Sequence, residues 1–337
     1  MDLKEVRQNA KERMPAQCRV CPICDGRACA GEVPGMGGTG TGAAFKENIE
    51  ALAAYKLNLR TIHEAKEPNT QFELFGKKLE TPVIAAPITG AKINMGGFLT
   101  EAEYIEAVIQ GSMKAGSVGM SGDTGDPTIY TAGLDAIKRA GGFGIPFIKP
   151  REQSEIISRL QLAQEAGAFA AGVDVDGAGL VIMKMLGQPV GPKSPAEIKE
   201  LTTSTELPFI VKGIMTVDEA EMAVEAGAKG IVVSNHGGRV LDHTPGAADV
   251  LPEIVEAVKG QVVIMVDGGV RTGTDVLKYL ALGADCVLVG RPVIIGAVGG
   301  YAEGVQLTID KLTAELKQAM ILTGCADLAS INETVIF

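Results

Sequence analysis

The sequence predicts an α/β protein built on a (β/α)₈ TIM barrel that follows a Cys-rich N-terminal extension. From about residue 80 onward, short β-branched runs alternate with amphipathic stretches of roughly ten to fifteen residues, which is the pattern of repeated βα units. Eight such units follow one another without a long interruption, and this favours a closed barrel over an open sheet. We therefore expect residues 46–337 to form the barrel. Residues 1–45 are expected to contain a helix, a Cys-rich segment and a Gly-rich connector.

The eight expected strands are short and apolar, and helices lie between them. Three helices are followed by a small-residue step in which Gly167, Gly227 and Gly283 are expected to take the left-handed conformation that ends a helix. The expected strands are Pro82 to Ala86, Ser117 to Met120, Gly144 to Lys149, Ala170 to Val175, Phe209 to Lys212, Gly230 to Ser234, Val262 to Asp267 and Asp285 to Val289. The helices expected between them include Glu101 to Ala115, Ser154 to Ala166, Val217 to Ala226 and Val276 to Leu282.

Composition excludes several classes of protein. The 337 residues carry a formal net charge of −10, which argues against general nucleic-acid binding. No apolar run approaches the ~18 residues of a membrane span. The N-terminus has charges throughout and no apolar core before a cleavage site, so we expect a cytoplasmic protein. We also expect a homo-oligomer that binds a small anionic substrate.

The sixth expected strand ends in Ser234-Asn235-His236-Gly237-Gly238-Arg239. Active sites of such barrels lie at the C-terminal ends of the strands. An imidazole can take a proton near neutral pH, and a guanidinium can bind a carboxylate through two parallel hydrogen bonds. His236 and Arg239 are therefore candidate catalytic residues, against the alternative of a core histidine and a surface arginine.

Glycines and arginines follow the last two expected strands. The seventh is followed by Asp267-Gly268-Gly269-Val270-Arg271, and the eighth by Gly290-Arg291. Backbone N–H groups of such glycines together with two guanidinium groups can bind a phosphate, where barrels commonly bind one. Ordinary turn glycines are the alternative.

Lys212 ends the fifth expected strand among apolar residues. An ammonium there is costly unless it faces a negative charge, such as the one a reduced flavin carries near N1. A lysine solvated at the rim of the barrel is the alternative.

The stretch around GIVVSNHGGRVLDHTPG and MVDGGVRTGTDVLKYLALGADCVLVGRP closely resembles the FMN-dependent 2-hydroxy-acid dehydrogenase and oxidase family, which includes lactate oxidase and glycolate oxidase. The resemblance is specific over about residues 205 to 300 and looser over 80 to 180. It implies a (β/α)₈ barrel that binds FMN and oxidises a 2-hydroxy acid or a similar anionic substrate.

The resemblance also implies residue roles. His236 would take the proton of the substrate hydroxyl while hydride moves to flavin N5, Arg239 would bind the substrate carboxylate, and Asp174 would orient the imidazole. The residues that would bind FMN are Pro87, Thr89, Lys212, Ser234, Asp267, Gly268, Gly269, Arg271, Gly290 and Arg291.

Two departures from the family pattern leave the substrate open. Phe147 stands where the family has a tyrosine at the end of the third strand, and residues 176–180 lack the arginine that the family carries after the fourth strand.

Two other functions also stay open. One is a flavin-dependent isomerase like the type 2 isopentenyl diphosphate isomerases, and the other is a metal or redox sensor without turnover.

Residues 30–45 form a Gly-rich stretch before the barrel. Because it does not follow a strand, it lacks the context of a dinucleotide-binding fingerprint. We expect a flexible connector, and a loop that folds over the mouth of the barrel is the alternative.

Cys18, Cys21, Cys24 and Cys29 have the spacing C-x2-C-x2-C-x4-C. This resembles the ferredoxin-type run for an iron–sulfur cluster, but it is one residue longer before the last cysteine and lacks the following proline. A zinc site and redox-active or reduced thiols are the alternatives. With a cluster, the reduced flavin would have a one-electron outlet, and the enzyme would act as a dehydrogenase toward an unidentified acceptor.

Overall fold

The computed structural model describes residues 1–180, 183–184 and 186–337 and contains a closed barrel of eight parallel strands. The strands follow one another around the barrel in the order β10-β3-β4-β5-β6-β7-β8-β9, so the predicted (β/α)₈ fold is confirmed. Every predicted strand corresponds to an observed one within two residues at each end. The barrel strands are β3 (Val83–Ala85), β4 (Gly119–Ser121), β5 (Gly144–Ile148), β6 (Ala171–Asp174), β7 (Phe209–Ile214), β8 (Gly230–Val233), β9 (Val263–Val266) and β10 (Cys286–Val289).

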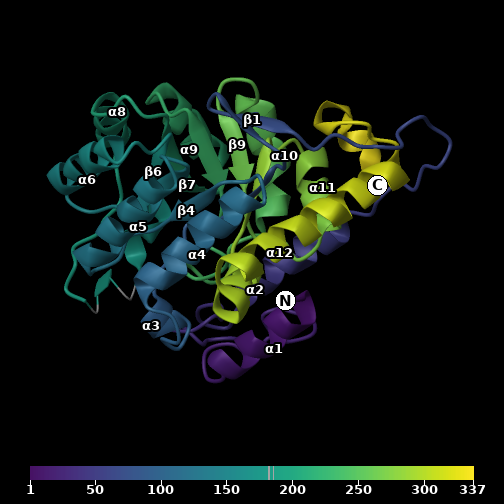
Figure 1. Cartoon of the computed structure of the whole chain (residues 1–337). Helices are drawn as coiled ribbons and strands as arrows, with labels where there is room; N and C mark the ends of the chain where they lie inside the picture. The colour runs from purple at the N-terminus through teal and green to yellow at the C-terminus, as the bar shows by residue number, and fades with distance from the viewer. Residues whose placement is uncertain (181–182, 185) are drawn as a thin grey trace.

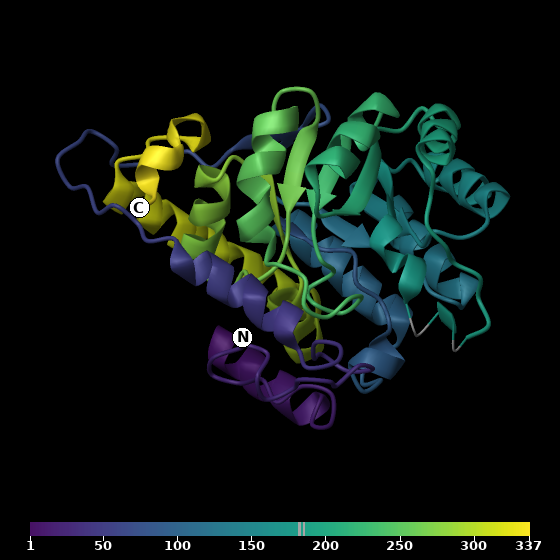
Figure 2. The ribbon, with the colours of Figure 1, turned by 180° about the vertical axis from the view of Figure 1, so that it is seen from behind.

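Helices surround the barrel (Figures 1 and 2). Gly167, Gly227 and Gly283 have φ values of +75°, +92° and +101°, which confirms their predicted role at helix ends. The last helix is interrupted at Gly300 and Tyr301, whose backbone angles are not helical. The helices that follow the barrel strands are α3 (Ala91–Asn94), α4 (Glu101–Lys114), α5 (Pro127–Arg139), α6 (Gln153–Glu165), α8 (Pro195–Thr203), α9 (Val217–Glu225), α10 (Ala247–Val258), α11 (Gly273–Ala281) and α12 (Arg291–Thr323).

The apolar core has two parts. One cluster fills the barrel interior and includes Phe147 and Met265, and the other lies between the strands and the helices. A hairpin of β1 (Phe72–Leu74) and β2 (Lys77–Leu79) adds Leu74 and Leu79 to the interior cluster. The interior is therefore packed rather than open, and a site of this fold is expected at the C-terminal end of the strands.

The N-terminal segment lies on the side toward which the barrel strands point (Figure 2). Helix α1 (Leu3–Arg13) starts with a capping box at Asp2 and packs against α12. The Arg13 guanidinium fixes this contact by donating to the carbonyl oxygens of Val298 and Gly299. Helix α2 (Ala43–Ala54) packs against α10 and spans the expected boundary between residues 45 and 46.

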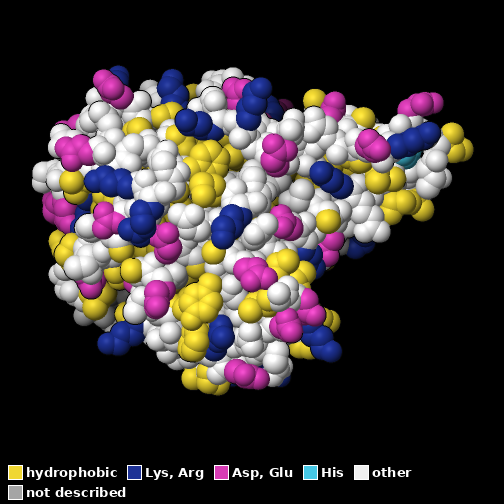
Figure 3. Space-filling view, viewed as in Figure 1, with side chains coloured by type: hydrophobic (Ala, Val, Ile, Leu, Met, Phe, Trp, Pro, Cys, Tyr) yellow, Lys and Arg dark blue, Asp and Glu magenta, His cyan; other side chains and the backbone are white. Residues whose placement is uncertain are grey.

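Charged side chains of both signs are interspersed over the face shown in Figure 3. Within the described residues, no helix is long and apolar enough to cross a membrane.

Candidate active site

A cavity of about 830 Å³ opens at the C-terminal end of the barrel. Most of the predicted site residues line it. From the predicted set, the residues that line the cavity are Pro87, Thr89, Lys212, His236, Arg239, Asp267, Gly268, Gly269, Arg271, Gly290 and Arg291. Ser234 and Asp174 do not.

His236 is held in one orientation at the cavity wall. Its Nδ1 lies 3.0 Å from Oδ2 of Asp176, and its backbone N–H donates to Oγ of Ser234 at 3.0 Å. The backbone takes a φ of +59°, an uncommon left-handed conformation for a residue with a side chain. In the described chain Nε2 of His236 has no hydrogen-bond partner, so this nitrogen is left for a ligand in the cavity.

The prediction that Asp174 orients His236 is wrong, because Asp176 does so. Strand β6 ends at Asp174, whose carboxylate pairs with the Lys149 ammonium from the end of β5. The chain then turns into a short 3₁₀ helix (Val175–Gly179) that carries Asp176 to the imidazole. Gly213 provides the space for the Asp176 side chain, because a Cβ at position 213 would lie 2.5 Å from the Cβ of Asp176. The sequence Asp174-Val175-Asp176 already showed a second carboxylate two residues after the predicted one.

Lys212 is buried among carboxylates rather than solvated at the rim. Its side chain is 5% exposed, and its Nζ lies 3.7 Å from carboxylate oxygens of both Asp176 and Asp267. Burial disfavours the ammonium, but the carboxylates of Asp176, Asp267 and Asp174 outweigh it and raise the pKa of Lys212. For Asp176, burial likewise opposes ionisation, but His236 and Lys212 lower the pKa of the carboxyl to about 2.

Ser234 lies behind the cavity wall and hydrogen-bonds to Lys212, Asp267 and the backbone of His236. Its hydroxyl accepts from Nζ of Lys212 at 2.9 Å and donates to Oδ1 of Asp267 at 2.7 Å. Because the side chain is fully buried, the predicted direct contact of Ser234 with the flavin does not fit this arrangement. Ser234 positions Lys212, Asp267 and the backbone of His236.

Arg239, Arg271 and Arg291 bring three positive charges to one end of the cavity. Within the described residues, none of them forms an ion pair with a carboxylate. Burial, reinforced by the neighbouring Arg271 and Arg239, lowers the pKa of Arg291 to about 9. Burial also lowers the pKa of Arg239 to about 10. Half-buried guanidinium groups without an ion-pair partner favour a bound anion, and a phosphate or carboxylate fits their geometry.

The glycines after β9 allow a close approach of the chain. A Cβ on Gly268 would lie 2.4 Å from Oδ1 of Asn48, and one on Gly269 would lie 2.2 Å from the Asn48 carbonyl oxygen. In the described chain the N–H groups of Gly269 and Gly290 donate to no protein acceptor. They are thus available for a ligand, and the phosphate-binding role expected of them stays a prediction.

The Gly-rich stretch is not a flexible connector, so that expectation is wrong. Arg239 donates to the carbonyl oxygens of Gly35 at 2.6 Å and Gly37 at 3.0 Å. Arg291 donates to the carbonyl oxygens of Met36 at 2.8 Å and Gly37 at 3.2 Å. These bonds hold the loop over the mouth of the barrel, which was the alternative to a flexible connector.

Lys149, rather than Phe147, faces the cavity at the end of β5. Phe147 points into the barrel interior, where it packs against Gly172, so the idea that it replaces the family tyrosine beside the substrate is wrong. The sequence analysis did not predict Lys149 as a site residue, although its position directly after β5 indicates one.

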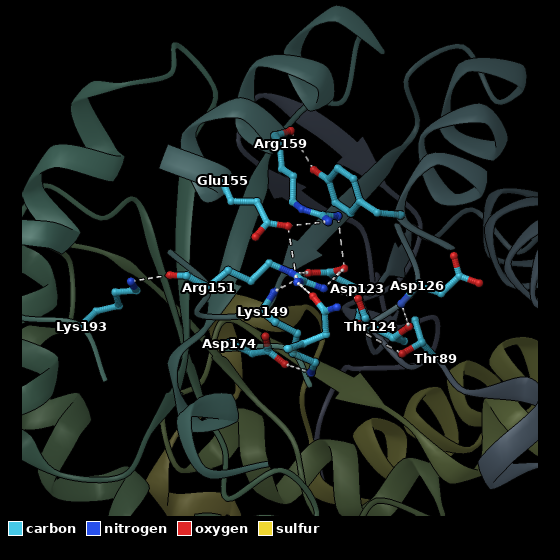
Figure 4. A network of polar contacts seen from close by, with 12 residues as sticks. Thr89, Asp123, Thr124, Asp126, Lys149, Arg151, Glu155, Arg159, Asp174 and Lys193 are labelled. Carbon is cyan, nitrogen blue, oxygen red and sulfur yellow. Dashed lines mark hydrogen bonds and ion pairs between the residues drawn. The ribbon is translucent and has the colours of Figure 1, made fainter. Parts of the chain in front are cut away.

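A buried polar network holds the neighbouring loop in place (Figure 4). The Asp123 carboxylate accepts from Nε of Arg151 at 2.8 Å, from Nη1 of Arg159 at 3.2 Å and from the backbone N–H of Lys149 at 3.1 Å. Arg151 also donates to the carbonyl oxygen of Thr124. This network fixes the direction from which Lys149 enters the cavity.

The four N-terminal cysteines line a second, smaller cavity. Burial raises the pKa of the Cys18 and Cys29 thiols. In the part of the chain that the structure describes, three metal-ligating side chains come within 4.8 Å of one another only at Asp174, Asp176 and His236. A zinc ion with thiolates at about 2.3 Å needs sulfur atoms about 3.8 Å apart, so the thiols are not gathered around a single zinc position.

The sequence model of the family described as FMN-dependent dehydrogenase matches residues 35–181 and 182–337. This chain belongs to that family. It is 34% identical over 330 residues to an L-lactate oxidase of Lactobacillus jensenii, an alignment that covers 86% of this chain and 79% of that protein. It is 32% identical over 324 residues to a 2-hydroxyacid oxidase of Dictyostelium discoideum, with coverages of 86% and 81%. A crystal structure of mandelate oxidase matches with a TM-score of 0.80 at 27% identity, covering 100% of this chain and 97% of that chain.

This member of the FMN-dependent dehydrogenase family is an FMN-dependent oxidoreductase, which decides against the isomerase and sensor readings. The cavity fits the cofactor, because a buried ammonium, two guanidinium groups and free backbone N–H groups surround a space within the usual range of about 300–1,000 Å³ for ligand sites. The family match begins at residue 35 and therefore excludes all four N-terminal cysteines.

Proposed function

We propose that this enzyme oxidises a 2-hydroxy acid, with His236 as the base. The observation that carries the proposal is the His236–Asp176 pair, which directs Nε2 of the imidazole into the cavity beside Arg239. Nε2 takes the hydroxyl proton, and the Asp176 carboxylate stabilises the resulting imidazolium. Arg239 binds the substrate carboxylate through the donors that it does not use on the loop carbonyls and on Oδ1 of Asn94. Bound FMN supplies the hydride acceptor.

The predicted cofactor residues divide into two groups along the cavity. Arg271, Arg291 and the N–H groups of Gly269 and Gly290 would bind the phosphate. Lys212 would face the flavin edge that becomes negative on reduction, and its carboxylate partners keep it charged. The residues that would contact the rest of the flavin and the ribityl chain are Pro87, Thr89, Asp267 and Gly268, which Ser234 supports from behind.

The substrate that we propose has an apolar side chain. Three apolar residues line the cavity at and after the segment where the family arginine is missing: Leu180 ends that segment, and Met183 and Leu186 follow it. Ile129 lines it as well. The names L-lactate oxidase and mandelate oxidase of the relatives support substrates of this class, since both acids carry an apolar group beside the hydroxyl-bearing carbon.

Anaerobic flavin reduction tests this function. FMN-loaded enzyme is mixed with a series of 2-hydroxy acids whose apolar side chains increase in size, and the loss of flavin absorbance is followed. We expect rapid bleaching by at least one acid, and none by its amide, because Arg239 requires a carboxylate. Bleaching by none of the acids, or equal bleaching by acid and amide, would contradict the proposal.

Three expectations from the sequence stay predictions. They are the cytoplasmic location, the homo-oligomeric state and the division at residues 45/46 into a Cys-rich segment and a catalytic barrel. We further propose that the four N-terminal cysteines bind a metal centre through which electrons leave the flavin for an external one-electron acceptor. The support is that all four thiols line one cavity beside Arg291.

A further inference from the structure

The cavity beside the N-terminal cysteines is a separate compartment from the flavin cavity. Its volume is about 30 Å³, and Cys18, Cys21, Cys24 and Cys29 all contribute to its wall. The two cavities share Met36 and Arg291 as lining residues. A single layer of side chains therefore separates the four thiols from the proposed phosphate site.

The spacing of the thiols selects among metal centres. All four lie around one cavity, yet no three sulfur atoms in the described chain approach within 4.8 Å of one another. One metal ion would need the closer spacing of a tetrahedral site. A four-iron cluster holds its cysteine sulfurs apart by the width of the cluster and therefore fits a wider arrangement around a common centre.

Hydrogen-bond donors already point at the sulfur atoms. The backbone N–H of Val20 donates to Sγ of Cys18, and Nη2 of Arg271 donates to Sγ of Cys24, both at 3.4 Å. Nε of Arg271 also binds the Cys24 carbonyl oxygen at 3.2 Å. Donors to sulfur stabilise the negative charge of a thiolate-bound cluster and tune its reduction potential.

The loop that carries the cysteines is anchored on both sides. Arg7 of α1 donates to the Cys21 carbonyl oxygen at 2.8 Å, and Arg19 forms an ion pair with Glu32 at 2.6 Å. On the barrel side, the guanidinium of Arg291 supplies a positive charge that no carboxylate of the described residues neutralises. A cluster with four thiolates is an anion, and Arg291 would lie between it and the proposed phosphate.

We infer that Cys18, Cys21, Cys24 and Cys29 ligate a [4Fe–4S] cluster, with Arg271 as a hydrogen-bond donor to the Cys24 sulfur. The inference deepens the proposed function by naming the metal centre, but the site itself does not depend on the substrate. The cluster would stand next to the phosphate end of the flavin cavity, on the far side of Arg291.

Metal analysis of the full-length enzyme tests the assignment. Protein purified without oxygen, and supplied with both iron and zinc during expression, is analysed for iron, zinc and acid-labile sulfide. We expect about four iron and four sulfide per chain and an electron paramagnetic resonance signal after dithionite reduction. Stoichiometric zinc without iron, or six free thiols per chain without metal, would overturn the inference.

Matched variants locate the cluster. Cys21→Ser should lose at least nine-tenths of the iron and sulfide, whereas Cys325→Ser, which changes a buried thiol outside the four, should retain both. Iron content unchanged in Cys21→Ser would refute this ligand set. FMN content and substrate-driven bleaching are measured on the same samples. In the wild-type enzyme, a cluster without bleaching would count against the proposed function alone, and bleaching without a cluster would count against this inference alone.

Discussion

Replacing Asp176 by asparagine should remove the charge that stabilises His236 when the imidazole takes a proton. For two unit charges 3.0 Å apart, an effective dielectric constant of about 20 gives an attraction of about 5.5 kcal/mol. Part of this is already offset, because Nζ of Lys212 lies 3.7 Å from the same carboxylate oxygen. The amide oxygen of asparagine can also still accept a hydrogen bond from Nδ1. We therefore expect a loss of about 3–4 kcal/mol in transition-state stabilisation, or a 10²- to 10³-fold slower flavin reduction.

Asp174→Asn is the matched control, since the two aspartates are two residues apart and only Asp176 contacts the imidazole. Each variant is loaded with FMN and mixed anaerobically with a saturating 2-hydroxy acid in a stopped-flow instrument. We expect Asp174→Asn to slow reduction by less than about tenfold, because its carboxylate binds Lys149 instead. Reduction of Asp176→Asn at the wild-type rate, or an equal loss in both variants, would refute the reasoning.

Four further outcomes follow from the site. His236→Ala should keep FMN bound but reduce flavin about 10²- to 10⁴-fold more slowly in the same stopped-flow assay, and near wild-type rates would remove the imidazole from catalysis. Arg291→Ala should weaken FMN binding by about tenfold to a hundredfold in a fluorescence titration, since a charged hydrogen bond is worth about 1.5–3 kcal/mol; an unchanged dissociation constant would place the phosphate elsewhere. In a double variant with Cys21→Ser and Cys24→Ser, substrate should still bleach the flavin but electron transfer to ferricyanide should be lost, and full turnover with ferricyanide would exclude an electron route through the cysteines. Because the pKa of Asp176 is lowered from 3.8 to about 2, the ionised carboxylate contributes fully to stability above pH 4, and this contribution is lost toward pH 2. The free energy of unfolding in urea should therefore fall less between pH 5 and pH 2.5 in Asp176→Asn than in wild type.

The sequence was sufficient for the features that repeat along the chain. The barrel strands are short apolar runs that alternate with amphipathic helices, and this periodicity is visible in the sequence alone. The sequence also predicted that His236, Arg239, Arg271 and Arg291 lie at the cavity, because each of them follows the end of a barrel strand.

The errors concern contacts between segments that are distant in sequence. The choice between Asp174 and Asp176 depends on where β6 ends and on the missing side chain of Gly213, neither of which the local pattern reveals. The burial of Phe147 depends on its register against Gly172 in the neighbouring strand. The Gly-rich loop looked flexible because its partners, the guanidinium groups of Arg239 in the loop after β8 and of Arg291 at the start of α12, come much later in the chain.

That long separation has a consequence for biosynthesis. The Gly35 carbonyl that binds Arg239 is synthesised 204 residues earlier than its partner, and the Met36 carbonyl that binds Arg291 is synthesised 255 residues earlier. The covering loop thus leaves the ribosome before either arginine, and it can make all of these bonds only after Arg291 has emerged. Closure of the barrel mouth is consequently a late event in synthesis, because the arginines that hold the loop follow it by more than 200 residues.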